Sequence, residues 1–328
     1  MTVPLLNISG LKKYFPVKGL FRVAGYVRAV DGVDLAIDEK ETVGLVGESG
    51  CGKSTAGRVI LRLLDPTAGK VFFKGKDVFK LKGPELKQFR REAQIILQDP
   101  YTSLNPRMNI FELIMEPLHV HGTPVDNPED FVVSALESVG LEREHIYRYP
   151  HEFSGGQRQR IAILRVLVLK PSFIVLDEPT SALDVSVQAQ ILNTLKELQE
   201  KMGLSYLFIS HDLGVVEYMA HRLAVMYIGK IMEVASSEEI FEKALHPYSQ
   251  ALLGAIPVPD PGFARKRSRL TIKGEPPSPI NPPKGCRFHP RCPYAFDRCP
   301  KEEPKLLEVE SAHYAACFLL GLRGIKSG

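Results

Sequence analysis

The sequence predicts an α/β fold, and the first reason is a strand, a glycine-rich loop and a helix in direct succession. Residues 42–46 form a continuous apolar run that ends at the loop, and residues 54–64 follow with helical spacing. The helix is expected to stop at Asp65-Pro66. The second reason is a set of later apolar runs that predict further strands, at residues 173–176, 205–210, 222–227 and 230–234.

Other segments predict additions to this core. Residues 5–15 and 26–37 have the alternating apolar positions of short strands. Residues 105–170 carry helical patterns interrupted by several prolines, which predicts a mostly helical insertion. Residues 257–290 are rich in proline and predict a linker or wrapping segment, and the basic run at 265–269 is expected to be solvated surface.

Composition limits the class of protein. The chain has 328 residues, of which 44% are apolar and 24% charged, as in ordinary globular proteins. The net charge of +4 suits nucleotide phosphates or an anionic membrane surface and is not a signature of nucleic-acid binding. No apolar run approaches the roughly 20 residues that span a bilayer, and the N-terminus does not resemble a signal peptide. We therefore expect a soluble, cytoplasmic protein.

Residues 47–54 read Gly47-Glu48-Ser49-Gly50-Cys51-Gly52-Lys53-Ser54, which is a complete phosphate-binding loop. The glycines let successive backbone N–H groups point at phosphates, and the following helix adds its N-terminal dipole. Lys53 is expected to reach the β- and γ-phosphates of ATP, Ser54 to bind Mg²⁺, and Thr55 to assist at the α-phosphate. Cys51 occupies a variable position and is interpreted as a small filler.

A second acidic motif follows at Phe173-Ile174-Val175-Leu176-Asp177-Glu178-Pro179. The predicted strand places Asp177 and Glu178 at its carboxyl end. Asp177 is the expected carboxylate near Mg²⁺, and Glu178 is expected to orient and polarise the attacking water. A chance acidic pair becomes improbable when a phosphate loop precedes it in the chain.

With these motifs, the chain resembles the ATP-binding cassette (ABC) family, whose fold has a P-loop NTPase (RecA-like) core, an antiparallel β subdomain and a helical subdomain. Gln98 matches the glutamine that contacts Mg²⁺ or water, His211 matches the histidine at the γ-phosphate, and Asp184 lies in the loop that crosses the dimer interface. Tyr14 or Phe15 matches the aromatic residue that stacks on adenine, and Tyr14 is preferred. The signature motif is matched by Ser154, Gly155, Gly156 and Gln157.

The resemblance implies four regions. Residues 1–97 would form the ATP-binding core with its β subdomain, and residues 98–165 the helical signature subdomain. Residues 166–245 would complete the core, and residues 246–328 would form a C-terminal extension. It also implies a partner, because the signature motif of one cassette faces the phosphate loop of another, with two ATP molecules between them. One chain carries one set of motifs, so a second cassette is required.

Several stretches resemble a narrower group, the ATPase subunits of dipeptide and oligopeptide importers. They are residues 45–54, 98–107, 149–153 and 246–253, and residues 149–153 resemble the F-type subunit. The resemblance implies a heterodimer with a second ATPase, two transmembrane permease subunits, an extracellular peptide-binding protein and a peripheral place on the cytoplasmic face of the membrane. Importers of nickel or other small solutes, and soluble cassette ATPases without a transport role, are the alternatives.

The last 43 residues contain four of the five cysteines, Cys286, Cys292, Cys299 and Cys317. Four thiolates in a short, proline-rich segment can bind Zn²⁺ or hold an iron–sulfur cluster. The spacing differs from the paired cysteines of common zinc folds. The importer resemblance implies a [4Fe–4S] cluster, and zinc or no metal remain the alternatives. The predicted fold thus ends in a Cys-rich metal-binding extension.

Overall fold

The structure is a computed structural model that describes residues 3–19, 23–99, 103–181, 183–255, 272 and 274–322. The chain divides into two compact units. The first unit comprises Met1–Ile37, Thr42–Phe79 and Phe208–Gly328, and the second comprises Asp38–Glu41 and Lys80–Leu207. Residues 257–271 and 273 of the predicted linker, which include its basic run, lie outside the described residues. No helix of the described part is long and apolar enough to cross a membrane.

The first unit contains an antiparallel sheet in the order β2-β1-β4-β5. Its strands are β1 (Leu6–Lys18), β2 (Val23–Ile37), β4 (Ala68–Phe73) and β5 (Lys76–Asp77). In β1, Leu6, Ile8 and Leu11 are buried whereas Asn7 and Ser9 are exposed, so one face of the strand packs into the core. The two strands expected at 5–15 and 26–37 are therefore confirmed.

The first unit also holds the strand that leads into the phosphate loop. All five residues of β3 (Thr42–Val46) are buried, and β3 pairs in parallel with β9 (Arg222–Tyr227), as expected of a strand covered on both faces. The sheet continues from β9 to β10 (Lys230–Ser236), β12 (His313–Ala315) and β11 (Leu307–Glu310). These two last strands, which the sequence did not predict, attach the C-terminal extension to the edge of the sheet.

Helices of the first unit are short. α1 (Lys53–Ile60) follows the phosphate loop, and it ends earlier than the predicted residue 64. Arg62 adopts a left-handed φ of 53°, which an α-helix cannot continue through, so the predicted end is wrong by one turn. The other helices described in this unit are α8 (Leu213–Met219), α9 (Ser237–Lys243), α10 (Pro247–Gly254), α12 (Leu319–Leu322) and the 3₁₀ turn His289–Arg291. The 3₁₀ turn Val78–Lys80 runs from this unit into the second.

The second unit combines parallel strands with a helical subdomain. β6 (Ala93–Ile96) follows α2 (Gly83–Glu92) and pairs in parallel with β7 (Phe173–Asp177), while β8 (Ser205–Ile209) crosses the boundary between the units. The predicted helical insertion is confirmed. It consists of α4 (Ile110–His121), α5 (Pro128–Ser138), α6 (Gly155–Leu167) and the 3₁₀ turns Arg143–His145 and Pro150–Glu152.

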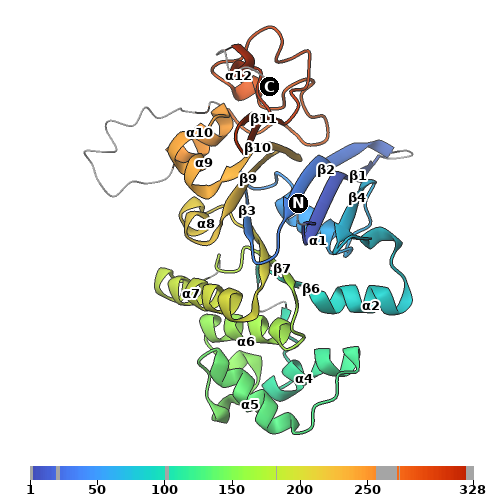
Figure 1. The fold of residues 1–328 in the computed structure, drawn as a ribbon, viewed down its shortest axis with the longest axis vertical. Coiled ribbons are helices and arrows are strands. Elements are labelled where there is room, and N and C mark those ends of the chain that lie inside the picture. The colour runs from blue at the N-terminus through green and yellow to red at the C-terminus, as the bar shows by residue number, and fades with distance from the viewer. Residues whose placement is uncertain are drawn as a thin grey trace, which may run out of the picture. The chain divides into compact units, whose positions relative to one another are not determined.

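The helical subdomain has its own apolar core, and Figure 1 shows α4, α5 and α6 gathered together. Ile110 and Ile114 of α4, Leu136 of α5 and Ile161 of α6 are all fully buried in it. α4 begins with a capping box, in which the Asn109 side chain accepts a hydrogen bond from the Glu112 N–H and the Glu112 carboxylate accepts one from the Asn109 N–H. After the subdomain, α7 (Val185–Met202) follows β7 along the chain.

Candidate nucleotide-binding site

The phosphate loop joins β3 to α1 and requires glycine at two of its positions. A Cβ atom on Gly52, whose φ is +109°, would lie 1.9 Å from the carbonyl oxygen of Ala29. A Cβ on Gly47 would lie 2.1 Å from the carbonyl oxygen of Met226. Real Cβ atoms do not approach backbone oxygens so closely, so only glycine allows the loop to curl against β2 and β9.

Lys53 lies inside the curl of this loop. It is the first residue of α1 and is 5% exposed. Its Nζ donates hydrogen bonds to the carbonyl oxygens of Gly47 at 2.7 Å and Glu48 at 3.1 Å. No side chain caps the N-terminus of α1, where Gly52 is the N-cap, so the loop and helix have the form of an anion site.

The remaining loop residues differ in exposure. Ser49 and Gly50 are exposed, and Ser54 and Thr55 of the first helical turn are half-buried. Cys51 is buried, and its burial raises the pKa of the thiol. A buried, protonated thiol is unreactive, which agrees with the interpretation of Cys51 as a small filler.

The first unit also holds the aromatic and histidine candidates. Tyr14 and Phe15 are both half-buried in β1, so exposure does not choose between them. Burial, together with a hydrogen bond that the Tyr14 hydroxyl donates to Asp31, raises the pKa of Tyr14 to about 12. His211 is exposed in the turn between β8 and α8, next to Asp212, whose carboxylate caps α8.

In the second unit, β7 ends at the two carboxylates that the sequence singled out. Asp177 is 3% exposed and Glu178 is half-buried. Glu178 has a φ of +49°, an uncommon conformation for a side chain of this kind, and such strain concentrates at functional sites. The Gln98 Nε2 donates a hydrogen bond of 2.9 Å to the Glu178 Oε2. The fold thus joins two predicted site residues that are 80 positions apart in the chain.

The signature residues open α6. Ser154 is the exposed N-cap, and its hydroxyl accepts a hydrogen bond from the Gln157 N–H, while the Gln157 side chain accepts one from the Ser154 N–H. Gly156 is buried against α7, where a Cβ would lie 2.4 Å from Val187 Cγ1. This geometry presents Ser154 and Gly155 at a helix N-terminus.

Asp184 caps α7 in the same way. Its carboxylate accepts hydrogen bonds from the Val187 N–H at 2.9 Å and the Ser186 hydroxyl at 2.7 Å. These bonds lower the pKa of Asp184, so it is charged at neutral pH. Tyr14, the phosphate loop and His211 therefore belong to the first unit, whereas Gln98, Asp177, Glu178, the signature and Asp184 belong to the second.

Two residues to which the sequence assigned no role at the site also contact the phosphate loop. Arg291 donates from Nη1 to both carboxylate oxygens of Glu48, at 3.0 and 2.8 Å. The Tyr248 hydroxyl accepts a hydrogen bond of 2.9 Å from the Glu48 N–H. In the sequence, Arg291 is an arginine beside Cys292 and Tyr248 is a tyrosine in an expected hallmark stretch. Neither pattern indicates that Glu48, which is 243 and 200 residues away respectively, is the contact.

The four cysteines of the extension lie close enough to influence one another. Cys286 and Cys299 are buried, and Cys292 and Cys317 are half-buried, all as free thiols. Burial, with a smaller contribution from the charges of neighbouring cysteines, raises the pKa of Cys286 to about 12 and that of Cys317 to about 11. Among the described residues, no group of three or more His, Cys, Asp or Glu side chains could hold a metal ion. The metal-binding role of the extension therefore stays a prediction.

Two protein-family models match different parts of this chain. A model described as "ABC transporter" matches residues 30–181, and one described as "Oligopeptide/dipeptide transporter, C-terminal region" matches residues 232–299. The putative oligopeptide transport ATP-binding protein YkfD of Bacillus subtilis is 51% identical over 97% of this chain and 96% of its own length. The oligopeptide transport ATP-binding protein AppF of the same organism is 50% identical over 96% of this chain and 97% of its own length.

Solved structures agree with the fold. The dimeric, ADP- and phosphate-bound cassette MJ0796 is 28% identical with a TM-score of 0.63 and covers 71% of this chain and 98% of its own. CbiO1 of Clostridium perfringens is 25% identical with a TM-score of 0.61, and the match covers 73% of this chain and 91% of CbiO1. The chain is therefore an ATPase with the ABC fold, and it belongs to the ABC transporter family, among the oligopeptide and peptide transport ATP-binding proteins.

Proposed function

We propose that this chain hydrolyses ATP to power the import of dipeptides and oligopeptides. The observation that supports the chemistry best is the 2.9 Å hydrogen bond between Gln98 and Glu178 at the end of β7. It brings a carboxylate and an amide together at the end of one strand, and two such groups can bind and orient an attacking water. The printed names of relatives that are half identical over nearly the whole chain support the peptide substrate.

The other site residues have roles in this proposal that follow from their chemistry. Lys53 binds the β- and γ-phosphates, Thr55 assists at the α-phosphate, and Tyr14 stacks on adenine. His211 contacts the γ-phosphate. Mg²⁺ would neutralise phosphate charge, with Ser54, Gln98 and Asp177 as the residues that hold it, since their oxygens are its preferred ligands. Ser154 to Gln157 and Asp184 would face the ATP of a second, different cassette.

Glu178→Gln tests this assignment, because the amide keeps the shape of the side chain and removes the base. We expect the variant to bind ATP as tightly as the wild type and to lose at least about a hundredfold in turnover. The measurements are phosphate release and retention of radiolabelled ATP after gel filtration. Glu197→Gln is the matched control, because Glu197 is an exposed residue of α7 that pairs with Lys201. Wild-type turnover in Glu178→Gln would contradict the role of Glu178.

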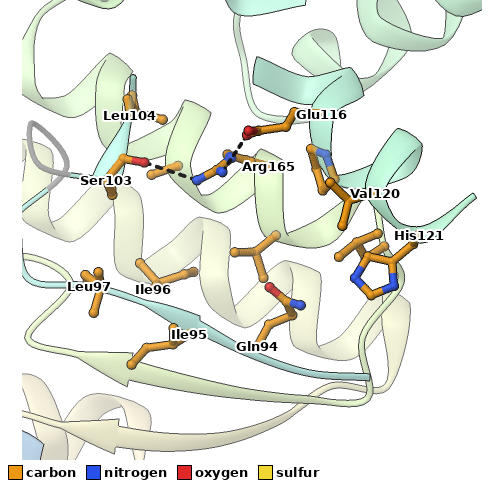
Figure 2. Close-up of a pocket in the computed structure, with 14 residues that line it drawn as sticks. Gln94, Ile95, Ile96, Leu97, Ser103, Leu104, Glu116, Val120, His121 and Arg165 are labelled. Atoms are coloured by element: carbon orange, nitrogen blue, oxygen red, sulfur yellow. Dashed lines mark hydrogen bonds and ion pairs between the residues drawn. The ribbon is translucent and has the colours of Figure 1, made fainter. Parts of the chain in front are cut away.

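A groove in the second unit is the proposed docking site for a permease subunit. It has a volume of about 480 Å³ and lies between β6, α4 and α6. Figure 2 shows Arg165 reaching across it, with hydrogen bonds to the Ser103 carbonyl oxygen at 3.1 Å and to Glu116 at 2.7 Å. Apolar side chains of Ile95, Leu97 and Val120 line the rest. Docking there would place the chain on the cytoplasmic face of the membrane as a peripheral subunit.

The extension would hold a [4Fe–4S] cluster in this proposal. Four free thiols gathered in one short segment form the soft donor set that such clusters take. A four-iron cluster occupies more space than one ion, so its thiolates lie further apart than the ligands of a single metal. The residues would be Cys286, Cys292, Cys299 and Cys317, and the cluster would stabilise a segment with little apolar material.

Metal analysis tests this part separately. We expect protein purified without oxygen to be brown, with about four irons and matching sulfide per chain. Cys292→Ser should lose the colour. One zinc per chain without colour would replace the cluster with a simple metal site, and absence of both metals would contradict a metal-binding extension. Neither result would alter the ATPase assignment.

A further inference from the structure

One short segment of the extension contacts both ends of the predicted nucleotide site. We call residues 286–292 the anchor segment; it reads Cys-Arg-Phe-His-Pro-Arg-Cys and belongs to the first unit. Its two arginines and its phenylalanine point into the unit. Each of the three contacts a different part of the structure that surrounds the phosphate loop and Tyr14.

At the phosphate end, Arg291 holds Glu48. The Arg291 side chain is 9% exposed, and its Nη1 donates to both oxygens of the Glu48 carboxylate, at 3.0 and 2.8 Å. Arg291 also donates to the Tyr227 hydroxyl at 3.3 Å. Charge-assisted hydrogen bonds in a largely buried setting are stronger than those between neutral groups. The second residue of the phosphate loop is therefore attached to the extension.

Glu48 is fixed through its backbone as well. Its N–H donates to the Tyr248 hydroxyl at 2.9 Å, and its carbonyl oxygen accepts from Lys53 Nζ at 3.1 Å. On the far side of the loop, the Gly229 N–H donates to the Cys51 carbonyl oxygen at 2.8 Å. Displacing the Glu48 side chain would therefore disturb the carbonyl groups that orient Lys53.

At the adenine end, Arg287 holds the partner of Tyr14. Arg287 is 3% exposed and donates to the Asp31 carboxylate and to the Ile228 carbonyl oxygen. The same carboxylate accepts the hydrogen bond of the Tyr14 hydroxyl. Burial alone would raise the pKa of Asp31, but the bond from Tyr14 and the charge of Arg287 hold it below its usual value. Asp31 is therefore charged, and it links Tyr14 to the anchor segment.

Between the two arginines, the Phe288 side chain packs the segment into the core of the unit. It is fully buried, and its ring centroid lies 5.4 Å from those of both Tyr227 and Tyr248. Tyr248 is the residue that accepts from the Glu48 N–H, and Tyr227 receives the hydrogen bond of Arg291. The anchor segment cannot shift without disturbing this aromatic cluster and both arginine contacts together.

We propose that Arg291 and Arg287 are positioning residues for ATP, and that the folded extension sets the ATP affinity of the phosphate loop through them. This inference rests on the proposed nucleotide site and adds that the extension regulates ATP binding there. An extension that loosens releases Glu48 and Asp31 and so weakens nucleotide binding. Because binding linkage is reciprocal, bound ATP must stabilise the anchor segment by the same factor.

The test is ATP affinity in the full chain, measured by titration with a fluorescent ATP analogue. Arg291→Met removes the charge and keeps most of the apolar stem, and we expect the dissociation constant to rise about tenfold. Glu48→Gln should weaken binding to a similar degree, and the double variant should be no weaker than either single variant. Arg298→Met is the matched control, because Arg298 pairs with Glu302 at 2.8 Å within the extension and should leave affinity unchanged.

Steady-state kinetics separate positioning from a catalytic role. Arg291→Met should raise KM for ATP while kcat at saturating ATP stays within about twofold, since the chemistry at Glu178 is untouched. Arg291→Lys should restore part of the affinity because it returns the charge without the guanidinium geometry. Wild-type affinity in both Arg291→Met and Glu48→Gln would overturn the inference. Should Arg291→Met fail to fold, Glu48→Gln, which leaves the extension intact, still decides.

Hydrogen exchange gives a readout that does not depend on turnover. We expect ATP to slow exchange of the backbone amides of residues 286–292 in the wild type and to have little effect on them in Arg291→Met. If wild-type protein binds no ATP analogue at all, the proposed function has failed. If it binds the analogue but the anchor segment exchanges at the same rate with and without ATP, only the coupling has failed.

Discussion

At the scale of single residues, the contact between Gly156 and Val187 determines how closely α6 approaches α7. A Cβ on Gly156 would lie 2.4 Å from Val187 Cγ1, and a β-branched side chain on a helix has little freedom to move away. We therefore expect Gly156→Ala to destabilise the protein by about 1–3 kcal/mol through overpacking. The measurement is the free energy of unfolding in urea.

A second substitution shows whether this contact is the cause. Val187→Ala removes the clashing methyl groups, so the double variant Gly156→Ala, Val187→Ala should be more stable than Gly156→Ala alone. Gly321→Ala, where a Cβ would meet no atom within 4 Å, is the matched control and should change stability little. Equal destabilisation in the single and double variants would place the strain elsewhere.

Phosphate-loop residues could be predicted from the sequence because their local spacing forms a motif, whereas Gln98 was identified by its resemblance to the ABC family. The structure pairs Gln98 with Glu178 and places Lys53 inside the phosphate loop, and the roles of these residues at ATP stay predictions. The contact between Arg291 and Glu48 could not be predicted, since its partners are 243 residues apart. A single arginine near a cysteine carries no periodic or motif signal for so distant a partner.

At the scale of elements, the start of α10 contains a titratable cap. The His246 Nδ1 accepts a hydrogen bond of 3.0 Å from the Tyr248 N–H, which requires that nitrogen to be unprotonated. Burial lowers the pKa of His246 from 6.5 to about 4, although the nearby Glu233 carboxylate opposes this shift. The ring also lies against Phe288, with centroids 5.8 Å apart. Native His246 is therefore neutral.

The pH dependence follows from this pKa difference. The unfolded chain takes up a proton on His246 near pH 6.5 and the native chain only near pH 4, so acid favours unfolding between these values. The contribution of His246 to stability is complete above the unfolded pKa, and we expect it to fall by about 2 kcal/mol between about pH 7 and pH 5. The measurement is the free energy of unfolding in urea at both pH values.

His246→Asn provides the comparison. Asparagine keeps a side-chain acceptor at the helix N-cap and does not titrate. The variant should be less stable overall, because it loses the packed ring, yet its stability should fall less on acidification than that of the wild type. The pair formed by His313 and Glu233 is present in both proteins and cancels in the comparison. Identical acid sensitivity in both proteins would contradict the assignment to His246.

Elements with strong local patterns could be predicted, and elements that depend on tertiary pairing could not. β1, β3 and the helical subdomain follow from apolar periodicity and turn residues. β11 and β12 have four and three residues and exist because β12 pairs with the edge of β10, which no local pattern encodes. The early end of α1 depends on the left-handed Arg62, which the predicted helical spacing did not reveal.

At the scale of the whole molecule, the predicted functional residues of this chain are distributed over its two units. The first unit contains the phosphate loop and the extension, and the second contains Gln98, Glu178, the signature residues and the groove between β6, α4 and α6. In the proposed function, the groove meets a permease subunit and the phosphate loop binds ATP. A substitution in the groove should act on assembly with the membrane, while one in the anchor segment should act on ATP.

Val120→Glu tests the groove at this scale. Val120 is 63% exposed and lines the groove (Figure 2), so a glutamate there places a charge where we expect an apolar permease helix to dock. We expect the share of tagged protein recovered with membranes to fall at least about fivefold, because burying an unpaired carboxylate is costly. Met202→Glu is the matched control, since Met202 is 37% exposed at the end of α7, outside the groove, and should leave membrane recovery unchanged. Equal recovery of Val120→Glu and wild-type protein would show that the permease subunits dock on another surface.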